Sequence, residues 1–150
     1  MAGPEIWGPP VWCLFHTLAE KVNEDEFKKL FPQMFHFVTR ISAYLPCPDC
    51  ANHATQHFSK IKPQQITCKK DFKNMLYIFH NMVNTRKKKP LYNYADMEKY
   101  KNMNIVQVYN RFTSVYHTKG NMQMLSDSFQ RQFIVKDFRK WMLNNMQHFQ

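Results

Sequence analysis

The sequence predicts an all-α protein: a four-helix bundle followed by a C-terminal helical extension. Only three glycines occur in 150 residues, and no segment sustains the alternation of apolar and polar residues that is typical of a half-buried strand. Apolar residues instead recur at intervals of three and four, the spacing of one helix face. With 44% hydrophobic residues, a chain of this length can bury a core without metals or many crosslinks, so we expect one compact unit.

The first two helices are predicted from apolar spacing and from the prolines at their ends. The first runs from about Pro10 to Asn23, because proline suits the first turn of a helix. The second runs from about Asp25 to Tyr44, where seven apolar residues form a stripe; Pro32 either kinks this helix or separates a leading turn from it. Pro46 should end it.

Two further helices complete the predicted bundle. The third starts at Pro48, ends near Lys60 and carries Cys50, His53 and His57 on one side, since their offsets are three and four residues. The fourth runs from about Lys69 to Lys87. Short connections between successive helices are typical of a bundle.

The C-terminal third of the chain is predicted to be helical as well. Helical spacing resumes at about Asn104, breaks around Gly120 and returns in a stretch from Val135 to Phe149. These residues are too few to bury much core alone. We therefore expect a bundle domain of residues 1–103 and a helical extension of residues 104–150, rather than two independent domains.

Charge and hydropathy limit the classes of partner. The chain carries 21 Lys and Arg against 11 Asp and Glu, a net charge of +10, which attracts phosphates, nucleic acid or acidic protein surfaces. Apart from Arg86–Lys89 the basic residues are dispersed, which favours a solvated basic face over a nucleic-acid groove. No signal-peptide core and no membrane-spanning run occur, so we expect no membrane partner and no export; the compartment stays unassigned.

The most informative local motif is Cys47-Pro48-Asp49-Cys50. Two thiols separated by two residues can close and reopen as a redox disulfide, and four cysteines in this chain are too few for a disulfide scaffold. The rival interpretation is a zinc site formed with His53 and His57, within a zinc-stabilised basic binding module. Its spacing is poor, because structural sites usually place the second ligand pair a dozen or more residues away. A thioredoxin-like fold would require strands around the motif, and none is predicted.

Three segments, in order, carry a family resemblance. They are Trp7–Trp12 followed by His16, Tyr44–Cys50, and His80–Asn84 followed by a basic stretch ending at Lys89-Pro90. Over roughly the first hundred residues the chain resembles the FAD-linked sulfhydryl oxidases of the Erv/ALR type, in particular their compact viral members. The resemblance implies a four-helix bundle with FAD at its mouth, and transfer of electrons from thiol proteins through the flavin to oxygen, which yields hydrogen peroxide.

The resemblance also assigns roles to individual residues. Cys47 would react with the substrate thiol, and Cys50 would lie against the flavin as a thiolate stabilised by the N-terminus of the third helix and by the flavin. No metal is implied. Thiol-containing proteins, including a thioredoxin-like carrier, would be the partners, and the protein would be a homodimer, in the host cytoplasm or the virion if viral. The residues implied to bind FAD are Gly8, Trp12, His16, Tyr44, His53, His80, Asn81, Val83, Asn84, Arg86 and Lys89.

Two departures from the family pattern bear on stability and on the electron path. Tyr77 and Tyr94 stand where the family usually carries a disulfide that joins the fourth helix to the following segment, and a packed tyrosine pair is the predicted substitute. No second C-x-x-C occurs in the sequence, so electrons should come directly from a partner. Cys13 and Cys68 are expected to be inert thiols. Without the cysteines, Trp12 would be interpreted as a core aromatic.

Overall fold

The computed structural model describes residues 3–116 and 125–149, and within them it is helical, with no named strand. The all-α prediction is therefore confirmed. An isolated antiparallel bridge joins Val22 to Phe149. The α-helices are α1 (Pro4–Lys21), α2 (Phe27–Ala43), α3 (Pro48–Ser59), α4 (Lys69–Arg86), α5 (Ile105–Tyr116) and α6 (Leu125–Asn145); the 3-10 helices are η1 (Glu24–Glu26), η2 (Pro63–Gln65), η3 (Tyr94–Asn102) and η5 (Met146–His148).

Two helices begin earlier than predicted. Helix α1 starts at Pro4 rather than Pro10, so Pro9 and Pro10 lie inside it although each lacks a backbone donor. The added turns bury Trp7 to 4% exposure, and this burial offsets the missing hydrogen bonds. Helix α6 starts at Leu125 rather than Val135. The predicted break around Gly120 lies outside the described residues.

Helix α2 runs without interruption through Pro32, after the separate turn η1. Its apolar residues recur at helical intervals and form one buried stripe, which is why its sequence alone marks it clearly. The predicted bounds of the third and fourth helices agree with those of α3 and α4 to within one residue. The buried members of the α2 stripe are Phe27, Leu30, Phe31, Met34, Phe37, Val38 and Ile41.

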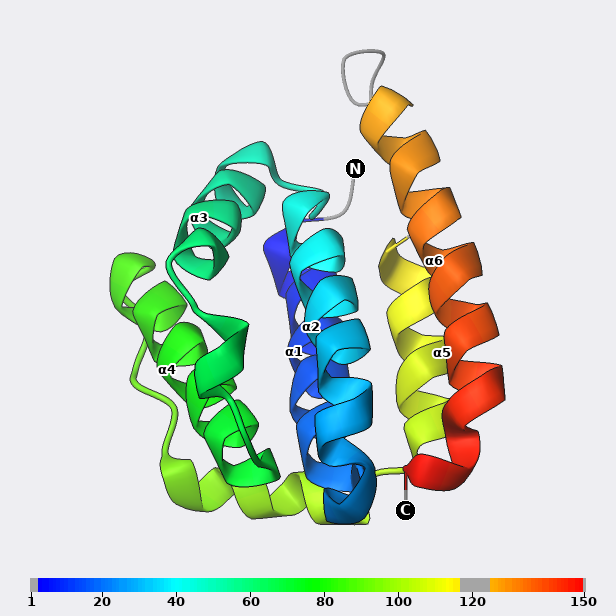
Figure 1. The fold of residues 1–150 in the computed structure, drawn as a ribbon. Coiled ribbons are helices and arrows are strands. Elements are labelled where there is room, and N and C mark those ends of the chain that lie inside the picture. The colour runs from blue at the N-terminus through cyan, green and yellow to red at the C-terminus, as the bar shows by residue number, and fades with distance from the viewer. Residues whose placement is uncertain (1–2, 117–124, 150) are drawn as a thin grey trace.

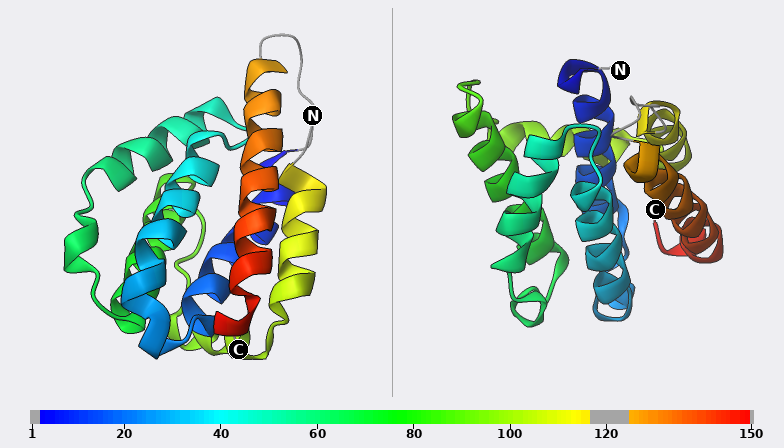
Figure 2. Two further views of the ribbon diagram at one scale, coloured as in Figure 1. Left: turned by 45° about the vertical axis from the view of Figure 1, so that its right-hand side comes forward. Right: turned by 90° about the horizontal axis from the view of Figure 1, so that it is seen from above.

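Helices α1 and α2 form the centre of the molecule, with α3 and α4 on one side and α5 and α6 on the other (Figures 1 and 2). The main helix contacts are α1 with α4 and α5, α2 with α3 and α6, and α1 with η3, which crosses one end of the bundle. Helix α1 is consequently buried on several sides. The extension shares this core, because Phe112, Tyr116 and Phe138 are 0% exposed. The domain boundary at residue 103 stays a prediction.

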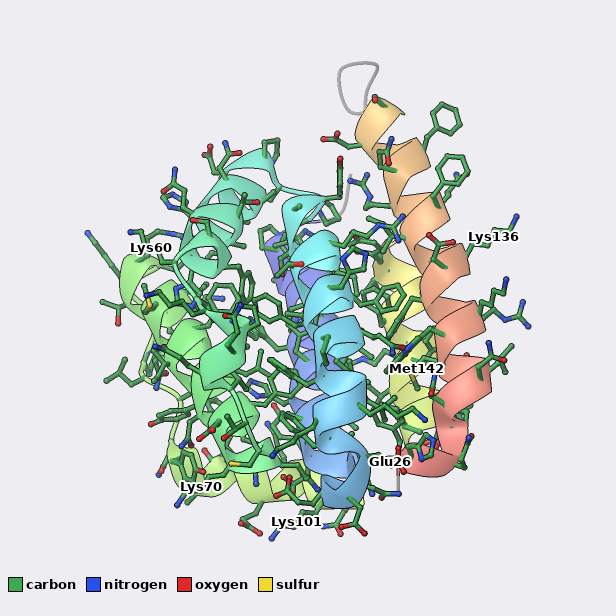
Figure 3. All side chains as sticks on the ribbon, viewed as in Figure 1. Glu26, Lys60, Lys70, Lys101, Lys136 and Met142 are labelled. Carbon is green, nitrogen blue, oxygen red and sulfur yellow. The ribbon has the colours of Figure 1, made fainter. Side chains whose placement is uncertain are left out.

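The positive charge is dispersed over the surface. The labelled lysines in Figure 3 lie at the end of α3 (Lys60), on α4 (Lys70), on η3 (Lys101) and on α6 (Lys136), whereas Met142 of α6 turns toward the core. This distribution agrees with a solvated basic surface. Among the described residues, no helix combines the length and the apolar character required to cross a membrane.

Candidate active site

The two cysteines of the C-x-x-C motif lie together at the start of α3. Pro48 occupies the first helical position and Cys47 is the N-cap, whose sulfur accepts a hydrogen bond from the Cys50 backbone N–H at 3.3 Å. The Cys50 thiol donates to the Cys47 sulfur at 2.6 Å. Both side chains are half-buried. The first turn of α3 therefore brings two sulfur atoms into direct contact, as a reversible disulfide requires.

A cavity of about 510 Å³ adjoins this pair. Its wall includes Cys50 but not Cys47, so the two sulfurs differ in their access to it. Apolar and aromatic side chains from α1 and α4, such as Phe15 and Phe79, line part of the cavity. Seven of the eleven residues predicted to bind a cofactor also line it: Gly8, Trp12, His80, Val83, Asn84, Arg86 and Lys89.

The other four predicted residues lie outside the cavity wall. His16 is 0% exposed, and Tyr44 is half-buried at the C-cap of α2. His53 is exposed on α3. Asn81 instead braces the segment after α4, because its side chain accepts from the Tyr92 backbone N–H at 2.6 Å and donates to the Tyr92 carbonyl at 3.2 Å.

A stack of flat rings builds one wall of the cavity. Trp12 and His80 are parallel, with ring centroids 3.9 Å apart and planes 3° apart. Behind them, Nε2 of His16 lies 2.9 Å from Nδ1 of His80, and Tyr92 and Tyr100 stack against the histidines. Such packing holds each ring in place.

Both histidines of this stack are neutral at pH 7. Burial, followed by the charges of His80 and Lys99, lowers the pKa of His16 to about 3. Burial, followed by Lys99 and Lys89, lowers the pKa of His80 to about 4. One ring therefore donates and the other accepts in the hydrogen bond between them. The ring stack contributes shape and polarity to the cavity without a positive charge.

Charge and unpaired polar atoms mark the cavity as a site for an anionic, polar ligand. Five cationic side chains line it against a single carboxylate, Glu5, among the described residues. Two further lining atoms, Nε1 of Trp7 and Oγ of Ser42, are buried without a hydrogen-bond partner among the described residues. The cationic residues are Arg86, Lys87, Lys89, Lys99 and Arg111.

Several of these lining residues were not identified from the sequence. Lys87 lies within the basic run of residues 86–89, in which the resemblance implies FAD-binding roles only for Arg86 and Lys89. Lys99 comes from η3 and Arg111 from α5, and both reach the cavity only through the packing of those elements on α1. Trp7 adjoins the noted Gly8, whereas no local pattern marks Ser42.

The thiolate predicted at Cys50, which the N-terminus of α3 and the flavin would stabilise, stays a prediction. Burial, followed by the hydrogen bond and the charge of Cys47, raises the pKa of Cys50 to about 11, and the charges of Lys87 and Arg86 only partly oppose this. Burial and the contact with Cys47 therefore favour the thiol form of Cys50 in the reduced pair. The N-cap position of α3 belongs to Cys47 instead.

The alternative zinc site is wrong. In the part of the chain that the structure describes, no three His, Cys, Asp or Glu side chains gather as a metal site would require. His53 points to solvent, and His57 stacks on Phe79 with centroids 4.8 Å apart. The two imidazoles thus take no part in a site with Cys47 and Cys50.

Comparison with known proteins places this geometry in context. Residues 9–108 match the family described as the Erv1 / Alr family. The chain is 32% identical over 94 residues to 347L of Invertebrate iridescent virus 6, a candidate FAD-linked sulfhydryl oxidase. This match covers 59% of the present chain and 85% of the viral protein.

Two other relatives are more distant. Identity is 27% over 88 residues to 096R of Invertebrate iridescent virus 3, also a candidate FAD-linked sulfhydryl oxidase, with coverage of 58% and 60%. It is 28% over 85 residues to the FAD-linked sulfhydryl oxidase ERV1 of Oryza sativa subsp. japonica, with coverage of 57% and 43%. The chain thus spans less than two thirds of these two relatives. No solved structure matches it.

Proposed function

The chain belongs to the Erv1/Alr family, and from this premise we propose that it is an FAD-dependent thiol oxidase that forms disulfides in protein substrates. The observation that carries the proposal is the contact between a thiol pair and a cavity suited to an anionic aromatic ligand. Cys50 lines that cavity, and Cys47 lies against Cys50 outside its wall. Two of the relatives are viral, in agreement with the predicted resemblance to viral members.

The residues of the cavity fit FAD. A flavin and an adenine are flat rings, which the Trp12 and His80 stack would hold, and the diphosphate requires cations such as Arg86 and Lys89. The buried Nε1 of Trp7 could bond a ligand oxygen, leaving no unpaired donor. When bound, FAD accepts the two electrons of a dithiol and transfers them to oxygen, which yields hydrogen peroxide.

The side chains of the thiol pair have separate tasks. A substrate thiolate attacks Sγ of Cys47 in the disulfide; the Cys47–Cys50 bond breaks, and Cys50 leaves with the electron pair and takes up a proton. A second substrate thiolate then attacks the substrate sulfur of the mixed disulfide and releases Cys47. The substrate has lost two electrons and two protons, and the protein holds two thiols.

Access, rather than thiol acidity, selects Cys47 as the sulfur that is attacked. Attack on Cys47 makes Cys50 the leaving group, and a thiol of pKa about 11 is a poor leaving group. Thiol acidity alone would therefore not direct the attack from Cys50 to Cys47. Cys50, however, lines the cavity that the cofactor would fill. A protein substrate therefore reaches Cys47 more easily.

The test is oxygen consumption by the purified, FAD-loaded protein after addition of dithiothreitol. The wild-type protein should bind FAD, consume oxygen and form peroxide. Cys47→Ser and Cys50→Ser should each abolish turnover, because one half of a disulfide switch does not function alone. Cys68→Ser is the matched control, since Cys68 is the N-cap of α4, away from the cavity wall, and it should keep full activity. Full turnover in either active-site variant would refute the mechanism.

The partners follow from the same proposal. The substrates would be protein thiols, including those of a thioredoxin-like carrier, and the chain would act as a homodimer. Light scattering during size-exclusion chromatography tests the dimer, and trapping of a mixed disulfide by the Cys50→Ser variant tests the protein substrates.

A further inference from the structure

The C-terminal extension is hydrogen-bonded to the end of α2, where the chain leads into the redox motif. The hydroxyl of Tyr116, at the end of α5, donates to the Ile41 carbonyl at 2.9 Å. Nη1 of Arg131, on α6, donates to the Tyr44 carbonyl at 3.2 Å. The Ile41 carbonyl also accepts from the Tyr44 backbone N–H at 3.3 Å, so the Tyr116 hydroxyl is its second donor. Arg131 supplies a donor to the C-cap carbonyl, which has no partner within a helix.

These two donors are buried, and one of them is charged. Arg131 and Tyr116 are both 0% exposed. Burial of a guanidinium is costly, and arginine is almost never fully buried unless it is paired. Here the cation lies at the C-terminal end of α2, where the helix dipole and the Tyr44 carbonyl favour positive charge. An ion pair of Arg40 with Asp137 at 2.8 Å also joins this turn of α2 to α6, but it lies at the surface, where such pairs contribute little.

The segment held in this way is short and lies at the cavity. The Tyr44 carbonyl precedes Cys47 by three residues, and Pro46 between them is buried. Ser42 and Leu45, on either side of Tyr44, both line the cavity. A shift of the end of α2 would therefore be transmitted through a few constrained residues to the N-cap of α3.

We propose that Arg131 and Tyr116 are positioning residues for the redox pair: by holding the end of α2, the extension fixes Cys47 and Cys50 relative to the cavity wall. This inference rests on the proposed thiol oxidase function and deepens it. It assigns a role in the reaction to residues outside the segment that matches the family, which ends at residue 108. A purely structural cap would stabilise the fold and leave the reactivity of the thiol pair unchanged.

The experiment uses the FAD-loaded chain of 150 residues with Tyr116→Phe and Arg131→Gln, and Asp137→Asn as the matched control. Tyr116→Phe deletes one hydroxyl and keeps the ring stacked on Phe112, with centroids 4.9 Å apart. Asp137→Asn breaks the surface ion pair of the same junction without removing either carbonyl's donor. The first readout is the rate at which excess dithiothreitol bleaches the flavin without oxygen, per bound flavin; the second is the equilibrium constant of the Cys47–Cys50 disulfide with glutathione.

We expect flavin reduction to slow about tenfold in Tyr116→Phe and up to about a hundredfold in Arg131→Gln, since a misplacement of about 1 Å can have that effect on a reaction. The rate at which oxygen reoxidises the flavin should stay at the wild-type level in both variants. In the control Asp137→Asn, the rate of flavin reduction should also stay at the wild-type level. The glutathione equilibrium should shift by about tenfold or more in both variants, because the geometry of the pair sets the stability of its disulfide.

Unchanged reduction rates and an unchanged glutathione equilibrium in Tyr116→Phe, with only a lower melting temperature, would overturn the inference. If Arg131→Gln fails to fold, Tyr116→Phe decides alone. If the wild-type chain does not reduce FAD, the proposed function fails, while the glutathione equilibrium still tests whether the extension positions the two cysteines.

Discussion

Removal of the Tyr77–Tyr94 contact tests whether ring packing replaces the disulfide that the family resemblance implies at these positions. Tyr77 lies on α4 and Tyr94 begins η3. Their ring centroids are 5.1 Å apart and their planes meet at 81°, an edge-to-face contact. The predicted contact is therefore present. We consider the variants Tyr77→Ala, Tyr94→Ala and the double variant.

The burial of the two rings sets the expected magnitude. Truncation of a fully buried aromatic side chain costs about 3–5 kcal/mol, but Tyr94 is 42% exposed and Tyr77 is half-buried. We therefore expect each single variant to lose about 2 kcal/mol of unfolding free energy. An edge-to-face pair contributes about 0.5–1.5 kcal/mol beyond its buried area, so the double variant should lose about 1 kcal/mol less than the sum of the single variants.

The assay is urea unfolding of the wild-type protein and the three variants at one FAD concentration, with Tyr77→Phe as the control that keeps the ring. The described part of the extension offers no substitute clamp at this point, because α5 and α6 lie on the opposite side of α1 and α2 from α4 (Figures 1 and 2). Losses that add to within about 0.3 kcal/mol would show that the two rings do not act as a unit and would refute the reasoning.

Three further predictions concern the site. In FAD-loaded Cys47→Ser at alkaline pH, where Cys50 ionises, the Cys50 thiolate beside the flavin should add a long-wavelength absorbance that Cys50→Ser lacks; the reverse pattern would exchange the two assigned roles. Since the pKa of Cys50 is raised to about 11, its alkylation rate in the reduced protein, followed by mass spectrometry, should rise about tenfold per pH unit up to pH 10, and a plateau near pH 8 would contradict this. The pKa of His16 is lowered to about 3, so below the ordinary value of 6.5 the unfolded chain binds a proton that the folded chain does not. The free energy of unfolding therefore decreases as the pH is lowered. Between pH 6.5 and 4.5 this loss of unfolding free energy is about 2 kcal/mol. Urea unfolding at several pH values should show that His16→Asn lacks this part of the pH dependence. An equal pH dependence in both proteins would count against a buried neutral His16.

The sequence alone determined the helical class, the bounds of α2 to α4, and the chemistry of the motif. These features are local: a stripe such as that of α2 repeats every three or four residues, and Pro46 and Pro48 delimit the redox turn through their own backbone geometry. The spacing of Cys47 and Cys50 likewise places both sulfurs on one helical turn, whatever packs around them.

Only the tertiary structure decided where α1 and α6 begin, which side chains face the cavity, and what the extension does. The early start of α1 depends on burial of Trp7 against distant residues, which outweighs the local cost of two prolines. Lys99 and Arg111 reach the cavity from elements that a helical pattern cannot orient relative to α1. The buried Arg131 bonds a carbonyl 87 residues earlier in the chain, and a local pattern carries no information on a partner so remote, because such pairs form only when packing brings whole helices together.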